Sequence, residues 1–237
     1  MTRHLQRELE RLKKRILYLG AMVEERVDMA AKAVEKRDGR LAQEIIERDH
    51  EIDEAEIEIE EECLKILALH QPVAVDLRFL SAVIKINNDL ERIGDEAVNI
   101  AQRVLVIAKR EKLDIRFDYL LMAEKAKGML KRSLDAVVNL DLDSAVKVCI
   151  SDDEVDGLQR EAYDVIKDAV GKNPLRAGYL INMLLVSRHL ERIADHATNI
   201  AEEVVYMIEG EIVRHGRLPT GSRGSLFQKS REDGDNP

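Results

Sequence analysis

Leu90-Glu91-Arg92-Ile93-Gly94-Asp95-Glu96-Ala97-Val98-Asn99-Ile100-Ala101 is the stretch that decides the fold of this chain. It recurs one hundred residues later as Leu190-Glu191-Arg192-Ile193-Ala194-Asp195-His196-Ala197-Thr198-Asn199-Ile200-Ala201, with nine of the twelve positions identical and no gap. So long a match predicts an internal duplication. Each copy carries Glu-x-x-x-Asp-x-x-x-Asn, and we expect the rest of the chain to present these two copies on helices.

Around the two copies, apolar residues recur at spacings of three and four along six segments, which predicts six amphipathic helices. Their expected ranges are 4–36, 41–69, 75–109, 117–139, 142–170 and 176–213. Pro72 is expected to end the second helix, because proline disfavours helical geometry in the residue before it. Gly171 is expected to end the fifth helix, with Pro174 beyond it.

The predicted fold class is therefore all-α, with two tandem three-helix bundles that arise from the internal duplication. The first three-helix repeat is expected to span residues 1–112 and the second residues 113–214. Residues 215–237 contain four glycines, two prolines and almost no apolar residues, so they are expected to form a disordered tail.

Composition excludes several classes of protein. Hydrophobic residues make up 45% of the chain but aromatic residues only 3%, which favours packed helices with aliphatic cores. The formal net charge of −9 argues against a nucleic acid partner, which needs a clustered cationic surface. No apolar run approaches a membrane span and no secretory signal is found, so a cytoplasmic protein is expected. Cys63 and Cys149 are expected to be small buried residues, with no disulfide and no zinc site.

The repeated stretch places like charges on one helix face. Glu91 and Asp95 are four residues apart and lie opposite the apolar stripe, with Asn99 one turn further. Glu191, Asp195 and Asn199 repeat this pattern. A like-charge pair at this spacing destabilises a helix by a few tenths of a kcal/mol, so its presence in both copies suggests that a cation binds there.

A second carboxylate pair occupies matching places in each half. Asp49 and Asp53 flank a core position of the second helix, and Asp152 and Asp156 do so on the fifth. Each half thus offers two carboxylate pairs on neighbouring helices, a donor set that suits hard cations or iron. The residues alone leave open a plain solvated acidic face, with Arg92 and Glu96 as a candidate ion pair.

Two classes of enzyme do not fit these residue types. A ferritin-like di-iron site needs Glu-x-x-His on paired helices, whereas Glu191 and His196 are five residues apart. Ser187 and His189 are two apart on a helix and point to different faces, so they cannot form a nucleophile and base pair. No glycine-rich phosphate loop is present, so ATP hydrolysis by this chain is not expected.

At these residues the sequence resembles the PhoU family, the accessory proteins of bacterial phosphate-specific transport, over about residues 5–213. The resemblance implies a cytoplasmic, homodimeric helical regulator that contacts the ATPase of the phosphate ABC transporter and a membrane sensor histidine kinase. Such a protein meets the membrane only through its partners and keeps phosphate-starvation genes repressed when phosphate is plentiful.

The resemblance also implies a multinuclear metal cluster, with iron as the expected metal and other divalent cations as alternatives. Its acidic pattern carries over onto the following residues: Glu91, Asp95, Glu191, Asp195, Asp49, Asp53, Asp152, Asp156, Asn99 and Asn199. The expected function is thus negative regulation of phosphate uptake and phosphate-starvation signalling by a metal-binding protein. A metal-dependent phosphoester hydrolase with a two-metal site and a metal-free helical adaptor are the alternatives.

Overall fold

The computed structural model describes residues 3–113, 115 and 117–212, so the expected disordered tail 215–237 lies outside the described residues. The described residues form seven α-helices and one short 3-10 helix, and no strand occurs among them. The elements are α1 (Arg3–Lys36), α2 (Gly39–Glu47), α3 (His50–His70), α4 (Ala74–Ile107), α5 (Tyr119–Asn139), α6 (Leu142–Lys172), η1 (Pro174–Arg176) and α7 (Ala177–Glu209).

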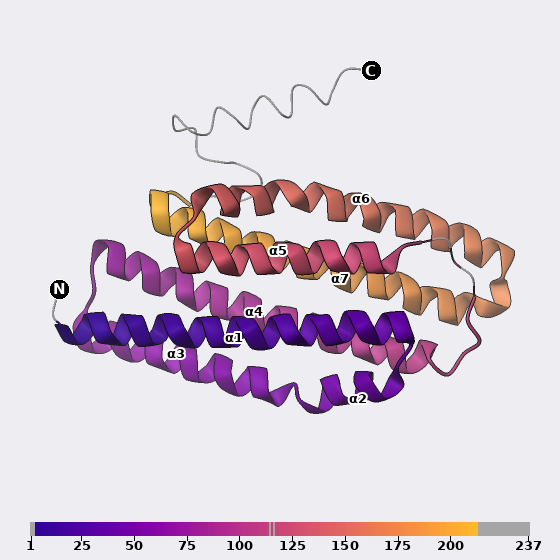
Figure 1. Cartoon of the computed structure of the whole chain (residues 1–237), viewed down its shortest axis with the longest axis horizontal. Helices are drawn as coiled ribbons and strands as arrows, with labels where there is room; N and C mark the ends of the chain where they lie inside the picture. The colour runs from indigo at the N-terminus through magenta and orange to yellow at the C-terminus, as the bar shows by residue number, and fades with distance from the viewer. Residues whose placement is uncertain (1–2, 114, 116, 213–237) are drawn as a thin grey trace, which may run out of the picture.

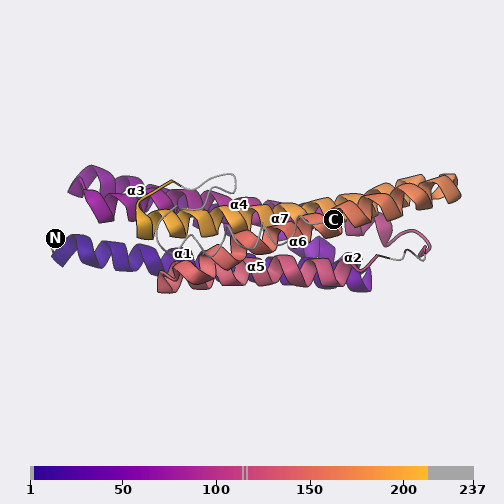
Figure 2. The same ribbon diagram turned by 90° about the horizontal axis from the view of Figure 1, so that it is seen from above.

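The predicted all-α duplication is confirmed. One three-helix unit comprises α1, α2 with α3, and α4, and the other comprises α5, α6 and α7. The two units lie side by side in an elongated molecule, with α4 packed along α7 and α1 packed along α5 (Figures 1 and 2). Buried side chains of both units form one continuous hydrophobic cluster, so the repeats share a single core.

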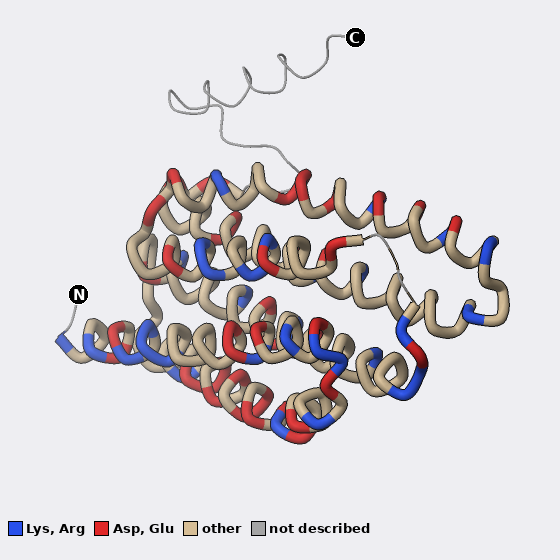
Figure 3. The backbone as a smooth tube through the Cα atoms, turned by 45° about the vertical axis from the view of Figure 1, so that its right-hand side comes forward, with Lys and Arg blue, Asp and Glu red and all other residues tan. Residues whose placement is uncertain are grey.

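The apolar period of the motif helices sets their orientation in this core. The buried positions include Leu90, Ile93 and Ala97 of α4 and Leu190, Ile193 and Ala197 of α7. The acidic residues of each motif lie on the other side of the same helix, so burial of the apolar stripe leaves the carboxylates near the surface. Figure 3 shows that Asp and Glu are especially frequent along α3, next to α4.

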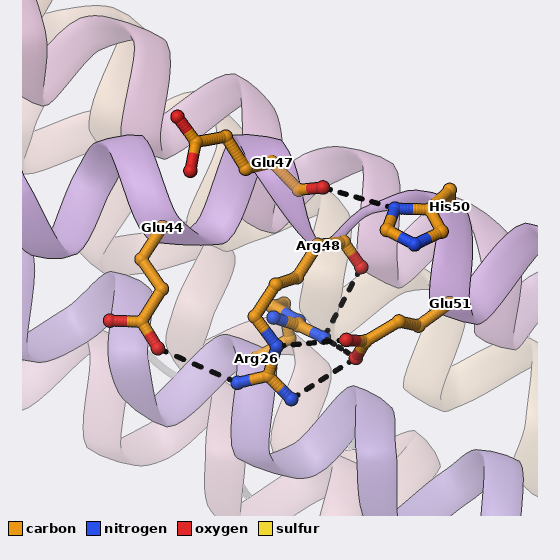
Figure 4. A network of polar contacts seen from close by, with 6 residues as sticks. All are labelled: Arg26, Glu44, Glu47, Arg48, His50 and Glu51. Carbon is orange, nitrogen blue, oxygen red and sulfur yellow. Dashed lines mark hydrogen bonds and ion pairs between the residues drawn. The ribbon is translucent and has the colours of Figure 1, made fainter.

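The expectation of one continuous helix over residues 41–69 is wrong. The segment is divided into α2 and α3 by a turn at Arg48 and Asp49, where Glu51 N–H donates to Arg48 O and Ile52 N–H to Asp49 O. At this turn the Arg48 carbonyl also accepts a hydrogen bond from Arg26 Nη2 at 3.4 Å (Figure 4). Periodicity missed this break because Ile45 and Ile52, seven residues apart, remain buried on either side of it.

Two helix ends also differ from the expectation. Gly171 does not end α6, which continues to Lys172, because Asn173 caps it by donating its backbone N–H and its side-chain Nδ2 to Ala169 O. Helix α7 ends at Glu209 instead of residue 213, since Gly210 adopts a left-handed conformation with φ of 76°. Asp141 caps the start of α6, because its Oδ1 accepts from Ser144 N–H at 3.1 Å.

Both cysteines are free. Cys63 is buried as expected, Cys149 is half-buried, and burial first of all raises the pKa of each thiol to about 12. Within the described ranges, no helix is both long and apolar enough to cross a membrane.

Candidate metal centre

The second half of the chain gathers three of the predicted carboxylates at one point. Asp156 of α6 and Glu191 and Asp195 of α7 each offer an oxygen, and these three oxygens lie within 4.8 Å of one another. Glu191 and Asp195 are brought together by their four-residue spacing, and Asp156 is brought to them by the packing of α6 along α7. Among the described residues, no other group of three acidic, histidine or cysteine side chains meets so closely.

Asp152 completes this second-half cluster, defined here as Asp152, Asp156, Glu191 and Asp195. Burial raises the pKa of Asp152 to about 6, with further contributions from the charges of Asp195 and Asp156. Burial likewise raises the pKa of Asp195 to about 6, followed by repulsion from Glu191 and Asp156. The four carboxylates therefore repel one another in a partly desolvated place, and a bound cation would relieve that repulsion.

The first half holds a first-half cluster of Asp49, Asp53, Glu91 and Asp95. Burial raises the pKa of Glu91, and the charges of Asp95 and Asp53 raise it further. Burial followed by repulsion from Asp53 and Asp95 raises the pKa of Asp49. These four carboxylates share one electrostatic environment, although their oxygens do not converge as tightly as those of the second half.

Glu56 is a further acidic residue beside the first-half cluster that sequence analysis missed. Burial and the charges of Glu60 and Asp53 raise its pKa, and its own charge contributes to the raised pKa of Glu91. Its backbone oxygen and Oε1 accept from Asn87 Nδ2 at 2.9 Å and 3.0 Å, so the side chain is held in place. The three-residue spacing from Asp53 was a signal that could have identified it.

The side-chain amides of the two motif asparagines contact acids outside the carboxylate clusters. Asn99 Nδ2 donates to Glu96 Oε2 at 3.4 Å, and Asn199 Nδ2 donates to Asp89 Oδ1 at 3.1 Å. Asn199 thus belongs to the polar contact between α4 and α7, whereas the contact of Asn99 lies within α4. Their role as metal ligands stays a prediction.

That contact, called here the α4–α7 seam, comprises Asp89, Glu96, His189, Arg192, His196 and Asn199. Glu96 lies 2.6 Å from His189 Nδ1 and accepts from Arg192 Nη1 at 3.0 Å, while His196 Nδ1 lies 2.8 Å from Asp89 Oδ1. The expected ion pair of Arg92 with Glu96 is therefore wrong. Buried Glu96 faces the other repeat and pairs with Arg192 instead of with Arg92 of its own helix.

The donor chemistry of the clusters fits a hard cation or iron. Every member is a carboxylate, and Asp152 Oδ1 is buried with no hydrogen-bond partner in the part of the chain that the structure describes. The histidines nearest the motif are engaged in the seam. A set of carboxylate oxygens on two packed helices can hold divalent cations and leave positions open for water or another oxygen ligand.

Comparison with known proteins matches most of both repeats. Residues 16–104 and 119–204 each match the family model described as the PhoU domain. A "Phosphate-specific transport system accessory protein PhoU homolog" from Clostridium acetobutylicum is 37% identical over 215 residues, covering 90% of this chain and 98% of that protein. A protein of the same description from Aquifex aeolicus is 39% identical over 212 residues, covering 90% of this chain and 96% of that protein.

Solved structures agree with the sequence matches. The crystal structure of PhoU from Pseudomonas aeruginosa superposes with a TM-score of 0.83 at 35% identity, covering 87% of this chain and 99% of that chain. The phosphate transport system regulatory protein PhoU from Streptococcus pneumoniae superposes with a TM-score of 0.80 at 30% identity, covering 89% and 100% respectively.

Proposed function

This chain belongs to the PhoU family, and from that premise we propose that it regulates phosphate-specific transport as an accessory protein. One observation carries the proposal: both repeats match the family domain, and the match extends over nearly the full length of relatives with that description. A shared fold alone would not support a shared role, but identity of 37–39% over 90% of the chain does.

Within that role we propose a cytoplasmic negative regulator. Its partners are the ATPase of the phosphate ABC transporter and the sensor histidine kinase, and it acts as a homodimer. Membrane contact comes only through those partners, and the chain itself has no catalytic activity. The elongated helical molecule supports this proposal, because it offers long faces for protein partners (Figure 1).

We propose further that both acidic clusters bind a multinuclear metal cluster, with iron as the metal. Asp152, Asp156, Glu191 and Asp195 would hold metal in the second half, and Asp49, Asp53, Glu91 and Asp95 in the first. The metal would supply positive charge between α3 and α4 and between α6 and α7, where carboxylates now repel. Convergence of three carboxylate oxygens within 4.8 Å supports the second-half site in particular.

Deletion of the gene tests the regulatory role. Cells that lack this protein and have no paralogue should express phosphate-starvation genes constitutively in phosphate-rich medium. A plasmid encoding the parent chain should restore repression, and the tagged protein should co-purify with the transporter ATPase or the sensor kinase. Normal repression in the deletion strain would count decisively against the proposal.

A turnover assay separates the regulator from a hydrolase. Purified protein loaded with Fe²⁺ or Mn²⁺ should release no phosphate from a panel of phosphoesters above the level of the Asp95→Asn, Asp195→Asn double variant. Turnover that this double variant abolishes would instead establish a metal-dependent hydrolase.

A further inference from the structure

Helices α1 and α3 are joined by ion pairs between side chains that face each other. The guanidinium of Arg15 lies 3.3 Å from the carboxylate of Glu58 and 3.0 Å from that of Glu62. Arg11, one turn nearer the start of α1, lies 3.8 Å from Glu62. Both arginines thus have acidic partners on α3, and the row of facing polar residues continues with Glu8, one turn further toward the start of α1.

Glu8 faces an imidazole instead of a cationic side chain. Its Oε2 lies 2.6 Å from Nε2 of His70, and no Lys or Arg among the described residues forms an ion pair with it. The same Oε2 is buried without a hydrogen-bond partner in the described part of the chain, so the contact with His70 is short but not aligned as a hydrogen bond. A carboxylate oxygen and an imidazole nitrogen so placed are both potential ligands of one metal ion.

His4 adds a second imidazole to this pair. It lies four residues before Glu8, so helical geometry places both side chains on the same side of α1. The ring centroids of His4 and His70 are 6.2 Å apart, with the rings nearly perpendicular at 89°. The three residues converge less closely than the second-half cluster, but His4 is exposed in the first turn of α1, where its side chain can rotate toward the other two.

The donor set differs in kind from that of the two acidic clusters. Two imidazole nitrogens and one carboxylate oxygen suit Zn²⁺ and related transition metals, whereas sets made only of carboxylates suit harder cations. Ligand bonds to zinc are about 2.0–2.2 Å long, so ligand atoms of one tetrahedral ion lie roughly 3.3 Å apart. The 2.6 Å contact of Glu8 with His70 would therefore open slightly to admit the ion, and water would take the fourth position.

This group of side chains has no counterpart in the second repeat. An offset of 103 residues relates α1 to α5, since it matches buried Leu19 with Met122 and buried Val27 with Leu130. Helix α5 therefore begins at the position of Ile16, and the first turns of α1 project beyond it (Figure 1). The group is separate from the duplicated acidic pattern, so it can be tested independently of the proposed function.

We propose that His4, Glu8 and His70 bind a divalent transition-metal ion, represented by Zn²⁺, where α1 begins and α3 ends. The bound ion links the first turns of α1 to the last turn of α3. It stabilises the folded chain, because the unfolded chain does not hold the three ligands together.

Calorimetric titration of Zn²⁺ into untagged, metal-stripped full-length protein tests the site. The Asp95→Asn, Asp195→Asn background weakens the two acidic clusters, so the histidine site dominates the titration. His4→Gln, Glu8→Gln and His70→Gln should each weaken Zn²⁺ binding about tenfold or more, since even residues that only orient metal ligands contribute that much. His50→Gln is the matched control and should leave the affinity unchanged, because this exposed imidazole contacts Glu47 O of the preceding turn.

Unchanged affinity in any one of the three variants, or an equal loss in His50→Gln, would overturn the proposal. Thermal denaturation with and without Zn²⁺ provides a second readout. Zn²⁺ should raise the Tm of the background protein but not that of its His4→Gln derivative. Because His4 is exposed, this derivative should match the background protein in chelator, which shows that its fold is intact.

The visible spectrum of bound Co²⁺ tests the geometry. Four-coordinate Co²⁺ absorbs visible light far more strongly than six-coordinate Co²⁺ held by carboxylates and water, so the parent should show intense bands. His4→Gln and His70→Gln should each remove these bands, whereas His50→Gln should keep them. Bands that persist in His70→Gln and disappear in Asp195→Asn would place the ion in the second-half cluster and overturn the proposal.

Discussion

His196 Nδ1 lies 2.8 Å from Asp89 Oδ1, and the duplication repeats this contact with the two positions swapped, since His189 Nδ1 lies 2.6 Å from Glu96 Oε2. Positions 89 and 189 correspond, as do 96 and 196, so each repeat contributes one member to each pair. A reciprocal contact of this kind is what two copies of one unit form when they pack about a two-fold axis. Here the first repeat supplies both acids and the second both histidines.

We predict that Glu96→Gln destabilises the fold through this seam. Burial acts to raise the pKa of Glu96, but the hydrogen bonds of His189 and Arg192 lower it overall, so Glu96 is ionised at neutral pH. Loss of these charge-assisted bonds should reduce the free energy of unfolding by about 1–3 kcal/mol, which thermal denaturation would show as a lower Tm.

The effect of Glu96→Gln should depend on pH. A carboxyl group whose pKa is lowered by folding contributes stability above its unfolded value, and this stability is lost as the pH falls through the folded value. The difference from the parent should therefore shrink below pH 4.5, the ordinary value for Glu96. Glu61→Gln on the exposed side of α3 is the control, and an equal effect of both substitutions would contradict the prediction.

Chelation should lower the melting temperature of the metal-loaded protein. Carboxylates of both clusters repel one another without metal, and a ligand that binds only the folded state stabilises it by about 2.7 kcal/mol at a hundredfold excess over its dissociation constant. Asp95→Asn combined with Asp195→Asn should lower the metal content while circular dichroism remains helical, since the apolar stripe is untouched. Metal content equal to that of the parent would show that the acidic faces are merely solvated.

The pH dependence of the melting temperature of the metal-free protein should show the repulsion among the carboxylates of the second-half cluster. Burial and neighbouring carboxylates raise the pKa of Asp195 from 3.8 to about 6. A carboxyl group with a raised pKa stabilises the fold below its unfolded value, and that stability is lost as the pH rises through the folded value. In chelator, Asp195→Asn should therefore melt higher than the parent at pH 7.5 and by a smaller margin at pH 5.

Because Asp195 is exposed, solvent screening reduces the expected margin at pH 7.5 to about 1 kcal/mol. Protons compete with metal for the same oxygens, so Mn²⁺ affinity of the parent should fall below pH 6. A stability difference between Asp195→Asn and the parent that does not change between pH 5 and pH 7.5 would contradict the repulsion between Asp195 and its neighbouring carboxylates.

Gly94 and Ile52 should be energetically coupled. A Cβ atom on Gly94 would lie 3.1 Å from Ile52 Cδ1 and 3.3 Å from Ile52 Cγ2, while the second repeat has Ala194 and Val155 at the matching positions. Compared with the first repeat, the second repeat thus has one carbon more on the motif helix and one carbon fewer on the helix that packs against it. We expect Gly94→Ala to destabilise the fold by about 1 kcal/mol, because crowding against a stiff β-branched side chain exceeds the gain in helix propensity.

The double variant Gly94→Ala, Ile52→Val should recover that loss. Ile52→Val alone should lower the free energy of unfolding by about 1 kcal/mol, since it removes a buried methylene. Urea denaturation of all four proteins gives the coupling energy, which should be about 1 kcal/mol or more in favour of the double variant. Additive effects would show that the two positions are independent.

The sequence by itself determined the duplication, the helical class and the acidic pairs of this protein. These are local properties: the period of Leu90, Ile93 and Ala97 reports the buried face of one helix, and the four-residue spacing of Glu91 and Asp95 places both carboxylates on the same side of it. Membership of the PhoU family likewise followed from the repeated motif, and the family domain matches both repeats.

Tertiary structure alone decided which side chains meet. Glu96 binds Arg192, 96 residues away, where the sequence suggested Arg92 four residues before it, because α4 packs along α7. The break at Arg48 and the burial of Arg26 also depend on packing between α1 and the turn before α3, which no local period records. Two nearly identical motifs therefore have different surroundings, since their environments come from distant helices that diverged after the duplication.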